Sequence, residues 1–264
     1  VDGDDLDAWE KALSDGAKVV FFESPSNPMQ GLVDITAVSD LAHQAGATVV
    51  VDNVFATPIL QKPLDLGADV VVYSTTKHID GQGRTLGGAI LGTEQYIVED
   101  VQPFIRHTGP ALSPFNAWVL TKSLETLPLR VNAEVASALA LAEALEELDG
   151  VERVWYPYLA SHPQHDLARS QMASGGTVVT FSVRGGKDAA FRLLNALEVI
   201  DISNNLGDSK SLVTHPASTT HRRLGPDVRA DMGITDGVVR VSVGLESIDD
   251  LISDVTQAVE VATS

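Results

Sequence analysis

Polar side chains follow three apolar segments of the sequence, at the points where the segments end. Glu23 opens the stretch ESPSNP, Asp52 follows the apolar run TVVV, and STTK, residues 74–77, follows DVVVY. Such runs predict short buried strands of a parallel sheet, and the ligands of such a sheet bind beyond the carboxyl ends of its strands. We therefore expect these polar groups to meet at one edge of a sheet.

A lysine and a carboxylate at neighbouring strand ends suit the chemistry of pyridoxal 5'-phosphate. The lysine amine forms a Schiff base with this cofactor, and the carboxylate keeps the pyridine nitrogen protonated, so that the ring accepts electrons. Lys77 and Asp52 are the candidates for these two roles. The hydroxyls of Ser74 and Thr76 are the candidate phosphate ligands.

Each of these residues alone has an ordinary structural explanation. A lysine is usually a solvated surface charge, and an Asp, Ser or Thr beside a loop usually caps backbone groups. The combination favours the cofactor site, because Lys77 is the only lysine of the chain that ends a predicted buried strand.

Three motifs indicate weaker alternatives. Residues 74–77 also match the S-x-x-K pattern of penicillin-binding enzymes, and SNN, residues 203–205, imitates their second motif, but no K-T-G follows. The loop GQGRTLG, residues 81–87, misses the dinucleotide-binding glycine spacing by one residue and does not open a helix. The short histidine spacing of HPQH, residues 162–165, is interpreted as a helix start at the surface, because no other metal ligand lies nearby.

The elements that must position these groups alternate between strands and amphipathic helices. This βαβ pattern predicts a mostly parallel sheet with right-handed crossovers. The predicted elements are a helix over 6–16, a strand over 18–22, a helix over 34–46 that Asp34 caps and Gly46 ends, strands over 48–52 and 69–77, and a further strand over 87–91.

A second, smaller α/β unit is predicted beyond a long connecting helix. Residues 113–148 are rich in Ala and Leu at helical spacing and contain Pro128, which predicts one kinked helix. We place a domain boundary inside it, so that residues 1–125 form the C-terminal part of a large cofactor-binding domain and 126–264 a smaller C-terminal domain. The later predicted strands cover 153–157, 176–183, 211–216 and 238–244, and the later helices cover 187–198 and 247–262.

The composition excludes several classes of protein. The chain of 264 residues is 44% hydrophobic and 20% charged, as in ordinary globular proteins. Its formal net charge of −18 argues against nucleic acid and anionic lipid as partners, because phosphate binding depends on Lys and Arg. The sequence has no cysteine, no membrane span and no secretory signal, so we expect a cytoplasmic protein. The chain opens with Val1, and VDGDD has the pattern of the end of a strand, so we expect the N-terminal part of the large domain to be absent.

Five motifs, in order along the chain, resemble the Cys/Met-metabolism family of pyridoxal phosphate enzymes. They are ESPSNP, VDNVFATP, STTKHIDGQGRTLGG, SLVTHPASTTH and VVRVSVGLES. The resemblance implies an α/β protein with the fold type I architecture of pyridoxal phosphate-dependent transferases, in which the large domain has a mostly parallel sheet. It also implies that Lys77 binds the cofactor, that Asp52 is the pyridinium partner, and that Ser74 and Thr76 bind its phosphate.

The resemblance assigns further residues. Asn27 is expected near the phenolate oxygen of the cofactor or the carboxylate of the substrate. Arg240 is expected to bind that carboxylate through its planar guanidinium, with Ser211 beside it, although VVRVSVG alone favours an arginine at the surface edge of a strand. Val54 departs from the family, because many members have Thr at this position, and any hydroxyl contact there is lost. The family's ring-stacking tyrosine, its glycine-turn phosphate site and the residues donated across its dimer interface belong to N-terminal sequence that this chain lacks.

The reaction that the resemblance implies is γ-replacement on an amino acid, with Lys77 as both the covalent anchor and the group that moves protons. The GQGR-x-LGG continuation most resembles that of the family members that use O-succinylhomoserine and sulfide, which implies homocysteine and succinate as products, in methionine biosynthesis. Arg84 is then expected near the succinyl carboxylate. Cystathionine γ-synthase and the cystathionine or methionine γ-lyases are alternatives, and an inactive fragment or a regulator is a non-enzymatic one. The family further implies a homotetramer built from dimers that share active sites.

Overall fold

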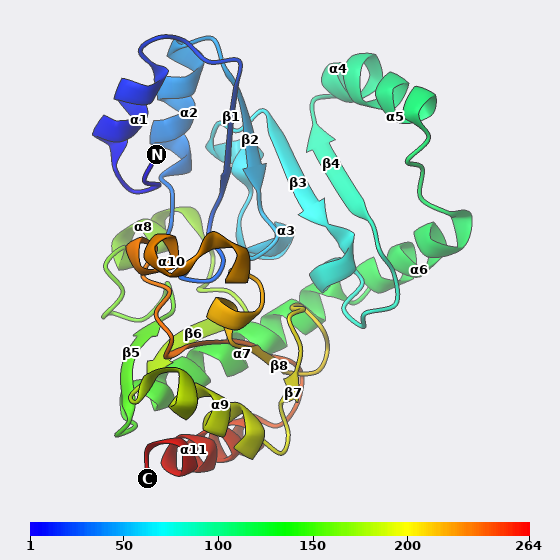
Figure 1. The fold of residues 1–264 in the computed structure, drawn as a ribbon. Coiled ribbons are helices and arrows are strands. Elements are labelled where there is room, and N and C mark those ends of the chain that lie inside the picture. The colour runs from blue at the N-terminus through cyan, green and yellow to red at the C-terminus, as the bar shows by residue number, and fades with distance from the viewer.

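Two separate β-sheets organise the chain, which the computed structural model describes from Val1 to Ser264 (Figure 1). The first sheet contains β1 (Val19–Glu23), β2 (Thr48–Asp52), β3 (Val70–Ser74) and β4 (Gly88–Gly92), in that spatial order. Strands β1, β2 and β3 are parallel, and β4 is antiparallel to β3. The predicted mostly parallel sheet is therefore confirmed, and the carboxyl ends of three strands lie at one edge.

Helices α1 (Leu6–Leu13) and α2 (Ile35–Gln44) lie side by side against the β1 and β2 half of this sheet (Figure 1). Their apolar faces and the strands share one core cluster. Asp34 caps α2 as predicted, since its Oδ1 accepts from the Ala37 amide at 3.0 Å. The start of the chain is not the end of a strand: residues 1–5 form a turn, and Asp5 caps α1.

The segment that follows β4 leaves the body of the molecule and returns to it (Figure 1). It contains α4 (Glu94–Tyr96), the π-helical turn Ile97–Val101, α5 (Gln102–Thr108) and α6 (Pro114–Leu124).

The short elements before β4 are α3 (Thr57–Leu60), the 3₁₀ turn Pro63–Leu66 and the π-helical turn Thr75–Ile79.

The predicted kinked helix over 113–148 is in fact two helices, α6 and α7 (Leu127–Glu146). The chain breaks at Glu125 and Thr126, and Pro128 lies in the first turn of α7. Proline is tolerated there because the amides of the first turn have no intrahelical partner. Pro128 therefore begins a helix and does not kink one.

The second sheet is mostly antiparallel and has the order β5-β6-β9-β8-β7. Helices α9 and α11 pack against each other and against this sheet. The elements of this half are β5 (Val151–Trp155), α8 (His165–Gln171), β6 (Val178–Val183), α9 (Gly186–Ala196), β7 (Asp201–Ile202), β8 (Leu212–Thr214), α10 (Pro226–Asp231), β9 (Val238–Ser242), α11 (Ile248–Thr263) and the 3₁₀ turns Pro216–Ser218 and Arg222–Leu224.

Helix α7 contributes to the cores of both sheets. Leu127 and Val131 belong to a cluster with the first sheet, whereas Leu141 and Leu145 belong to the core of the second. The helix start at HPQH is confirmed, but His162 is buried and so does not lie at the surface. No helix has both the length and the apolar character that a membrane crossing needs.

Candidate cofactor and substrate site

The carboxyl ends of β1, β2 and β3 are fixed to one another by buried polar contacts. Glu23 and Asp52 are direct neighbours in the parallel register of β1 and β2. The next residue, Asn53, is fully buried, and its Nδ2 lies 2.9 Å from both the Tyr73 hydroxyl and the Gln61 carbonyl oxygen. Asn53 therefore has a structural role and holds Asp52 at the edge of the sheet.

Asp52 has a carboxylate that the chain satisfies only in part. The amide of Val54 donates to Oδ1 at 3.0 Å, and Oδ2 accepts no hydrogen bond from the chain. Burial raises the pKa of Asp52, and the Val54 amide only partly offsets this effect. The positive charge of a protonated ring nitrogen beside this carboxylate would compensate the cost of its burial. Pairing with that nitrogen is the role predicted for Asp52.

Lys77 lies in the π-helical turn after β3, three residues beyond the end of the strand at Ser74. Its own backbone is not helical, with φ −89° and ψ −132°. The amine Nζ donates to Oδ1 of Asn205, which comes from the second half of the chain. Burial, together with the charge of Arg240, lowers the pKa of Lys77. A larger fraction of such a lysine is the neutral amine at neutral pH, the form that acts as nucleophile and accepts a proton.

The two predicted phosphate ligands flank Lys77 in different surroundings. Ser74 is the last residue of β3 and is the register partner of Gly88 on β4. Thr76 Oγ1 accepts from the Gly87 amide at 3.2 Å. Both residues are half-buried, and they lie on the same short segment as the lysine.

Arg240 is buried at 1% exposure on β9, which lies between β6 and β8. It is therefore not an arginine at the surface edge of a strand. Nη1 donates to Asn27 Oδ1 at 2.9 Å, and Nη2 donates to the carbonyl oxygens of Asn204 and Asn205 at 3.1 Å each. Burial lowers the pKa of Arg240 to about 10, and Nε has no partner. The guanidinium is held in place and keeps donors for an anionic ligand.

Ser211 does not lie where the sequence analysis expected it. In the register of β8 and β9 the partner of Arg240 is Thr214, and Ser211 precedes β8. The Ser211 hydroxyl donates to Glu246 Oε2 at 2.8 Å and accepts from the Gly244 amide at 2.9 Å. The residue beside Arg240 is Asn205, which we had considered only as part of an imitation motif.

Glu23 is a further residue of the site that the sequence analysis did not assign. Its Oε2 accepts from the Asn27 amide at 2.7 Å. The pKa of Glu23 is raised to about 7: burial is the main cause, the Asn27 amide and Arg240 oppose it, and the charge of Asp52 adds to it. The signal in the sequence was its position at the end of β1, in register with Asp52.

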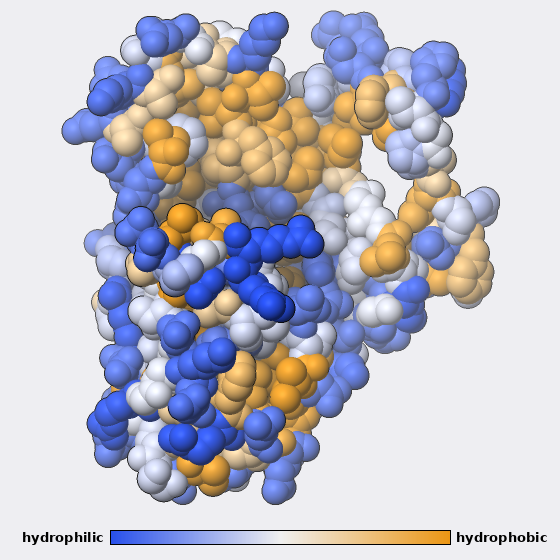
Figure 2. All heavy atoms as spheres, viewed as in Figure 1, coloured by the Kyte–Doolittle hydropathy of each residue, from blue (hydrophilic) through white to orange (hydrophobic).

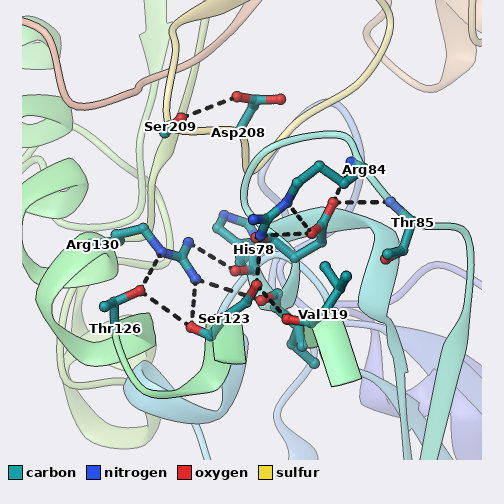
Figure 3. Close-up of polar contacts among 11 residues, drawn as sticks. His78, Arg84, Thr85, Val119, Ser123, Thr126, Arg130, Asp208 and Ser209 are labelled. Atoms are coloured by element: carbon teal, nitrogen blue, oxygen red, sulfur yellow. Dashed lines mark hydrogen bonds and ion pairs between the residues drawn. The ribbon is translucent and has the colours of Figure 1, made fainter. Parts of the chain in front are cut away.

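Arg84 belongs to a different group of contacts, which includes Ser123 (Figure 3). Its Nε donates to Asp80 Oδ1 at 3.0 Å and its Nη2 donates to Ser123 Oγ at 2.6 Å. Asp80 is buried, so this ion pair fixes the guanidinium against α6. We expected Arg84 near the succinyl carboxylate of the substrate. The structure does not support this, because the guanidinium is already paired with Asp80.

Comparison with known proteins gives consistent results. The sequence model of the family described as "Cys/Met metabolism PLP-dependent enzyme" matches residues 1–260. O-succinylhomoserine sulfhydrylase of Mycobacterium tuberculosis is 63% identical over 262 residues, which cover 98% of this chain and 64% of that protein. The enzyme of the same name from Pseudomonas aeruginosa is 54% identical over 253 residues, which cover 96% of this chain and 62% of that protein. The chain thus spans somewhat less than two thirds of the length of these two relatives.

A solved structure agrees in fold. The cystathionine gamma synthase from Xanthomonas oryzae pv. oryzae, crystallised in complex with cystathionine, superposes with a TM-score of 0.96 at 37% identity. The match covers 99% of this chain and 67% of that structure.

The residues present fit pyridoxal phosphate. An amine of lowered pKa, a carboxylate with an unpartnered oxygen and two hydroxyls come from neighbouring strand ends. The unpartnered Nε of the buried Arg240 supplies a donor for an anionic group beside them. Lys77, Asp52, Ser74 and Thr76 are the residues that would hold the cofactor.

Proposed function

Because the chain belongs to the Cys/Met metabolism PLP-dependent enzyme family, we propose that the protein carries out γ-replacement on O-succinylhomoserine with sulfide, giving homocysteine and succinate. The observation that carries this proposal is the meeting of Lys77, Asn205 and Arg240 beside the strand end that holds Asp52. The two relatives named O-succinylhomoserine sulfhydrylase, at 63% and 54% identity, support the choice of substrate.

Bound pyridoxal phosphate withdraws electrons from the substrate and so acidifies the protons on its α and β carbons. Lys77 Nζ binds the cofactor covalently and, when the amino acid displaces it, takes up and returns protons on the substrate carbons. The lowered pKa of Lys77 supports this role, because only a neutral amine accepts a proton. Asp52 holds the proton of the ring nitrogen through its unpartnered oxygen.

Arg240 binds the carboxylate of the amino acid and so orients its α carbon toward Lys77. Its contacts to Asn27 and to the carbonyl oxygens of the 204–205 loop support this role, because they leave the guanidinium one rigid position. Asn205 holds the amine of Lys77 beside Arg240, and Ser74 and Thr76 donate to the phosphate of the cofactor. We assign no substrate contact to Ser211.

The specificity can be tested on the full-length protein with four substrate pairs. O-succinylhomoserine and O-acetylhomoserine are each supplied with sulfide or with cysteine, and kcat/KM is compared. We expect the succinyl ester with sulfide to be preferred, and Lys77→Ala to abolish turnover in all four assays. Preference for the acetyl ester, or for cysteine as the nucleophile, would contradict the proposal.

A γ-lyase is the second candidate, because an L-methionine gamma-lyase of Pseudomonas putida is 46% identical over 262 residues. It would break the Cγ–S bond of methionine or cystathionine, release methanethiol or cysteine, and give a 2-oxo acid and ammonia with water and without an added nucleophile. Measuring ammonia in the absence of sulfide separates the two activities. The non-enzymatic alternative, a regulator on this fold, predicts turnover of no substrate.

We further propose a homotetramer of dimers that share active sites, located in the cytoplasm. Large apolar side chains on the first half of the chain support the assembly: Phe21 on β1 is 60% exposed, and Phe115 on α6 is 69% exposed. Figure 2 shows apolar residues gathered over the strands of the first sheet. Apolar patches of this kind usually lie in protein interfaces. The net charge of −18 supports small-molecule substrates and not nucleic acid.

A further inference from the structure

Four consecutive carbonyl groups follow Lys77, and each of them accepts a hydrogen bond from a residue outside the turn. Arg130 donates to two of them, from Nη1 to the His78 oxygen at 2.9 Å and from Nη2 to the Ile79 oxygen at 3.5 Å. Arg84 Nη2 donates to the Asp80 oxygen at 3.0 Å, and the Ser209 amide donates to the Gly81 oxygen at 2.7 Å. The end of a helical turn leaves such carbonyls without partners, so these donors determine where the turn ends.

Arg130 makes the contact nearest in sequence to the lysine, and its own position is rigid. It lies on α7 at 8% exposure, and its Nε donates to Thr126 Oγ1 at 3.3 Å. Nη2 also donates to the Ser123 carbonyl oxygen at 3.3 Å. All these acceptors are neutral, and Arg130 forms no ion pair within 4.0 Å. A cation beside the carbonyl end of a helical turn is electrostatically favourable.

Two glycines also pack closely at the turn after Lys77. Gly81 has φ +69°, and a Cβ there would lie 2.2 Å from Arg130 Nη1. Gly207 has φ +70°, and a Cβ there would lie 2.6 Å from the amide nitrogen of His78. Both values are far below ordinary van der Waals contact, so Gly81 packs directly against Arg130 and Gly207 against the backbone of His78.

We propose that Arg130 is a positioning residue for Lys77. By holding the carbonyl groups of the next two residues, it keeps the Lys77 backbone in its non-helical conformation and so directs the amine toward Asn205. Arg130 contacts no reacting atom in this arrangement and acts through the backbone. The inference rests on the proposed function, because it takes Lys77 as the lysine that binds the cofactor.

The test uses the full-length protein loaded with pyridoxal phosphate and two variants, Arg130→Met and Arg130→Lys. Methionine keeps most of the side-chain volume and removes the donors, whereas lysine keeps the charge but loses the fork. Two measurements report on Lys77: the pH titration of the visible absorption of the lysine-bound cofactor, and the rate of cofactor release into a trap. The charged groups near Arg130 are Glu134, Arg84, Asp80 and Asp208, and the variants leave all four in place.

We expect Arg130→Met to move the midpoint of the titration and to release cofactor about tenfold faster, with Arg130→Lys in between. Arg192→Met is the matched control. Its guanidinium also donates to a backbone carbonyl, that of Ala262, at 3.2 Å from Nε, but in the α9 and α11 region of the second half. This control should leave both measurements unchanged even if it lowers the unfolding temperature.

Two outcomes separate this inference from the proposed function. If both Arg130 variants keep the wild-type midpoint and release rate while only their stability falls, Arg130 is merely structural and the inference is wrong. Borohydride reduction followed by peptide mapping tests the premise independently, because it fixes the cofactor to the lysine that holds it. A label on a lysine other than Lys77 would overturn the proposed site itself. If Arg130→Met does not fold, Arg130→Lys alone decides the question by the same two measurements.

Discussion

The amine of Lys77 donates a hydrogen bond to the side-chain oxygen of Asn205. The backbone carbonyl of the same Asn205 accepts from Arg240 Nη2 at 3.1 Å. One residue of the 204–205 loop therefore connects the amine predicted to bind the cofactor with the guanidinium predicted to bind the substrate carboxylate. Because Asn205 belongs to the second half of the chain, the relative placement of the two halves sets the distance between these two groups.

The first prediction concerns the charge next to the amine. Asn205→Asp should raise the pKa of Lys77, since a carboxylate beside an amine favours its charged form. The cofactor attaches to the neutral amine, so the pH profile for growth of its visible absorption should move to higher pH. At a fixed pH the attachment rate should fall about tenfold for each unit of pKa change. The measurement starts from cofactor-free full-length protein.

Asn204→Asp is the matched control for this prediction. The substitution adds the same charge to the same loop as Asn205→Asp. Asn204 is exposed, however, and it contacts Arg240 only through its backbone carbonyl. If both variants shift the profile equally, the effect comes from the general field of the loop and not from the contact between Lys77 and Asn205.

The second prediction concerns Arg240. Arg240→Lys should raise the KM for the amino acid substrate by about tenfold or more and change cofactor affinity much less, because one ammonium cannot replace a planar fork held by Asn27 and two carbonyl groups. Cofactor affinity is measured by visible absorption and substrate affinity by steady-state kinetics. An equal loss of both affinities would show that Arg240 only supports the fold.

The residues of the cofactor site could be predicted because strand ends are local features. Asp52 and Lys77 each follow an apolar run, and the βαβ pattern places the ends of parallel strands at one edge. The positions of Asn205 and Ser211 could not be predicted in this way. Which residue of the segment 203–211 approaches Arg240 depends on the register of β8 and β9 and on the loop before β8, and neither leaves a periodic signal.

The break between α6 and α7 and the position of Arg84 were predicted wrongly, because each depends on contacts that the sequence pattern does not reveal. Thr126 and Pro128 fall inside a continuous Ala- and Leu-rich pattern, so periodicity alone did not reveal the break between α6 and α7. Arg84 follows the lysine closely in sequence, but the buried Asp80 holds its guanidinium toward α6. The division of the chain at residue 126 remains a prediction, because α7 contributes to the cores of both sheets.

The third prediction concerns the packing of Gly81 against Arg130. Gly81→Ala adds a Cβ 2.2 Å from Arg130 Nη1 at a residue with φ +69°. Gly109→Ala is the control, since Gly109 has φ +85° and no atom within 4 Å of the added Cβ. The control should cost about 1–2 kcal/mol for the left-handed backbone alone. Gly81→Ala should lower the free energy of unfolding in urea further and weaken cofactor binding, because Arg130 must move. Equal losses in the two variants would contradict the close packing.

A buried carboxyl group on α7 supplies the last prediction. Glu134 has 0% exposure, and neither of its carboxylate oxygens has a hydrogen-bond partner. The pKa of Glu134 is raised to about 7: burial is the main cause, Arg130 partly offsets it, and the charges of Asp208 and Glu246 add to it. The folded protein therefore binds this proton more tightly than the unfolded chain, in which the pKa is near the ordinary value of 4.5.

The sign of the resulting pH dependence follows from that difference. Between about pH 4.5 and pH 7 the folded state holds more protons at Glu134 than the unfolded state. The contribution of Glu134 to stability is therefore complete below this pH range and is lost as the pH rises through it. Glu134→Gln should remove the loss, so the decrease in unfolding free energy from about pH 5 to about pH 8 should be smaller than in the wild type by roughly 1–3 kcal/mol. Urea unfolding at the two pH values measures it. Glu143→Gln, an exposed change on the same helix, should keep the wild-type pH dependence, and the same result for Glu134→Gln would mean that Glu134 is charged in the folded protein throughout this range.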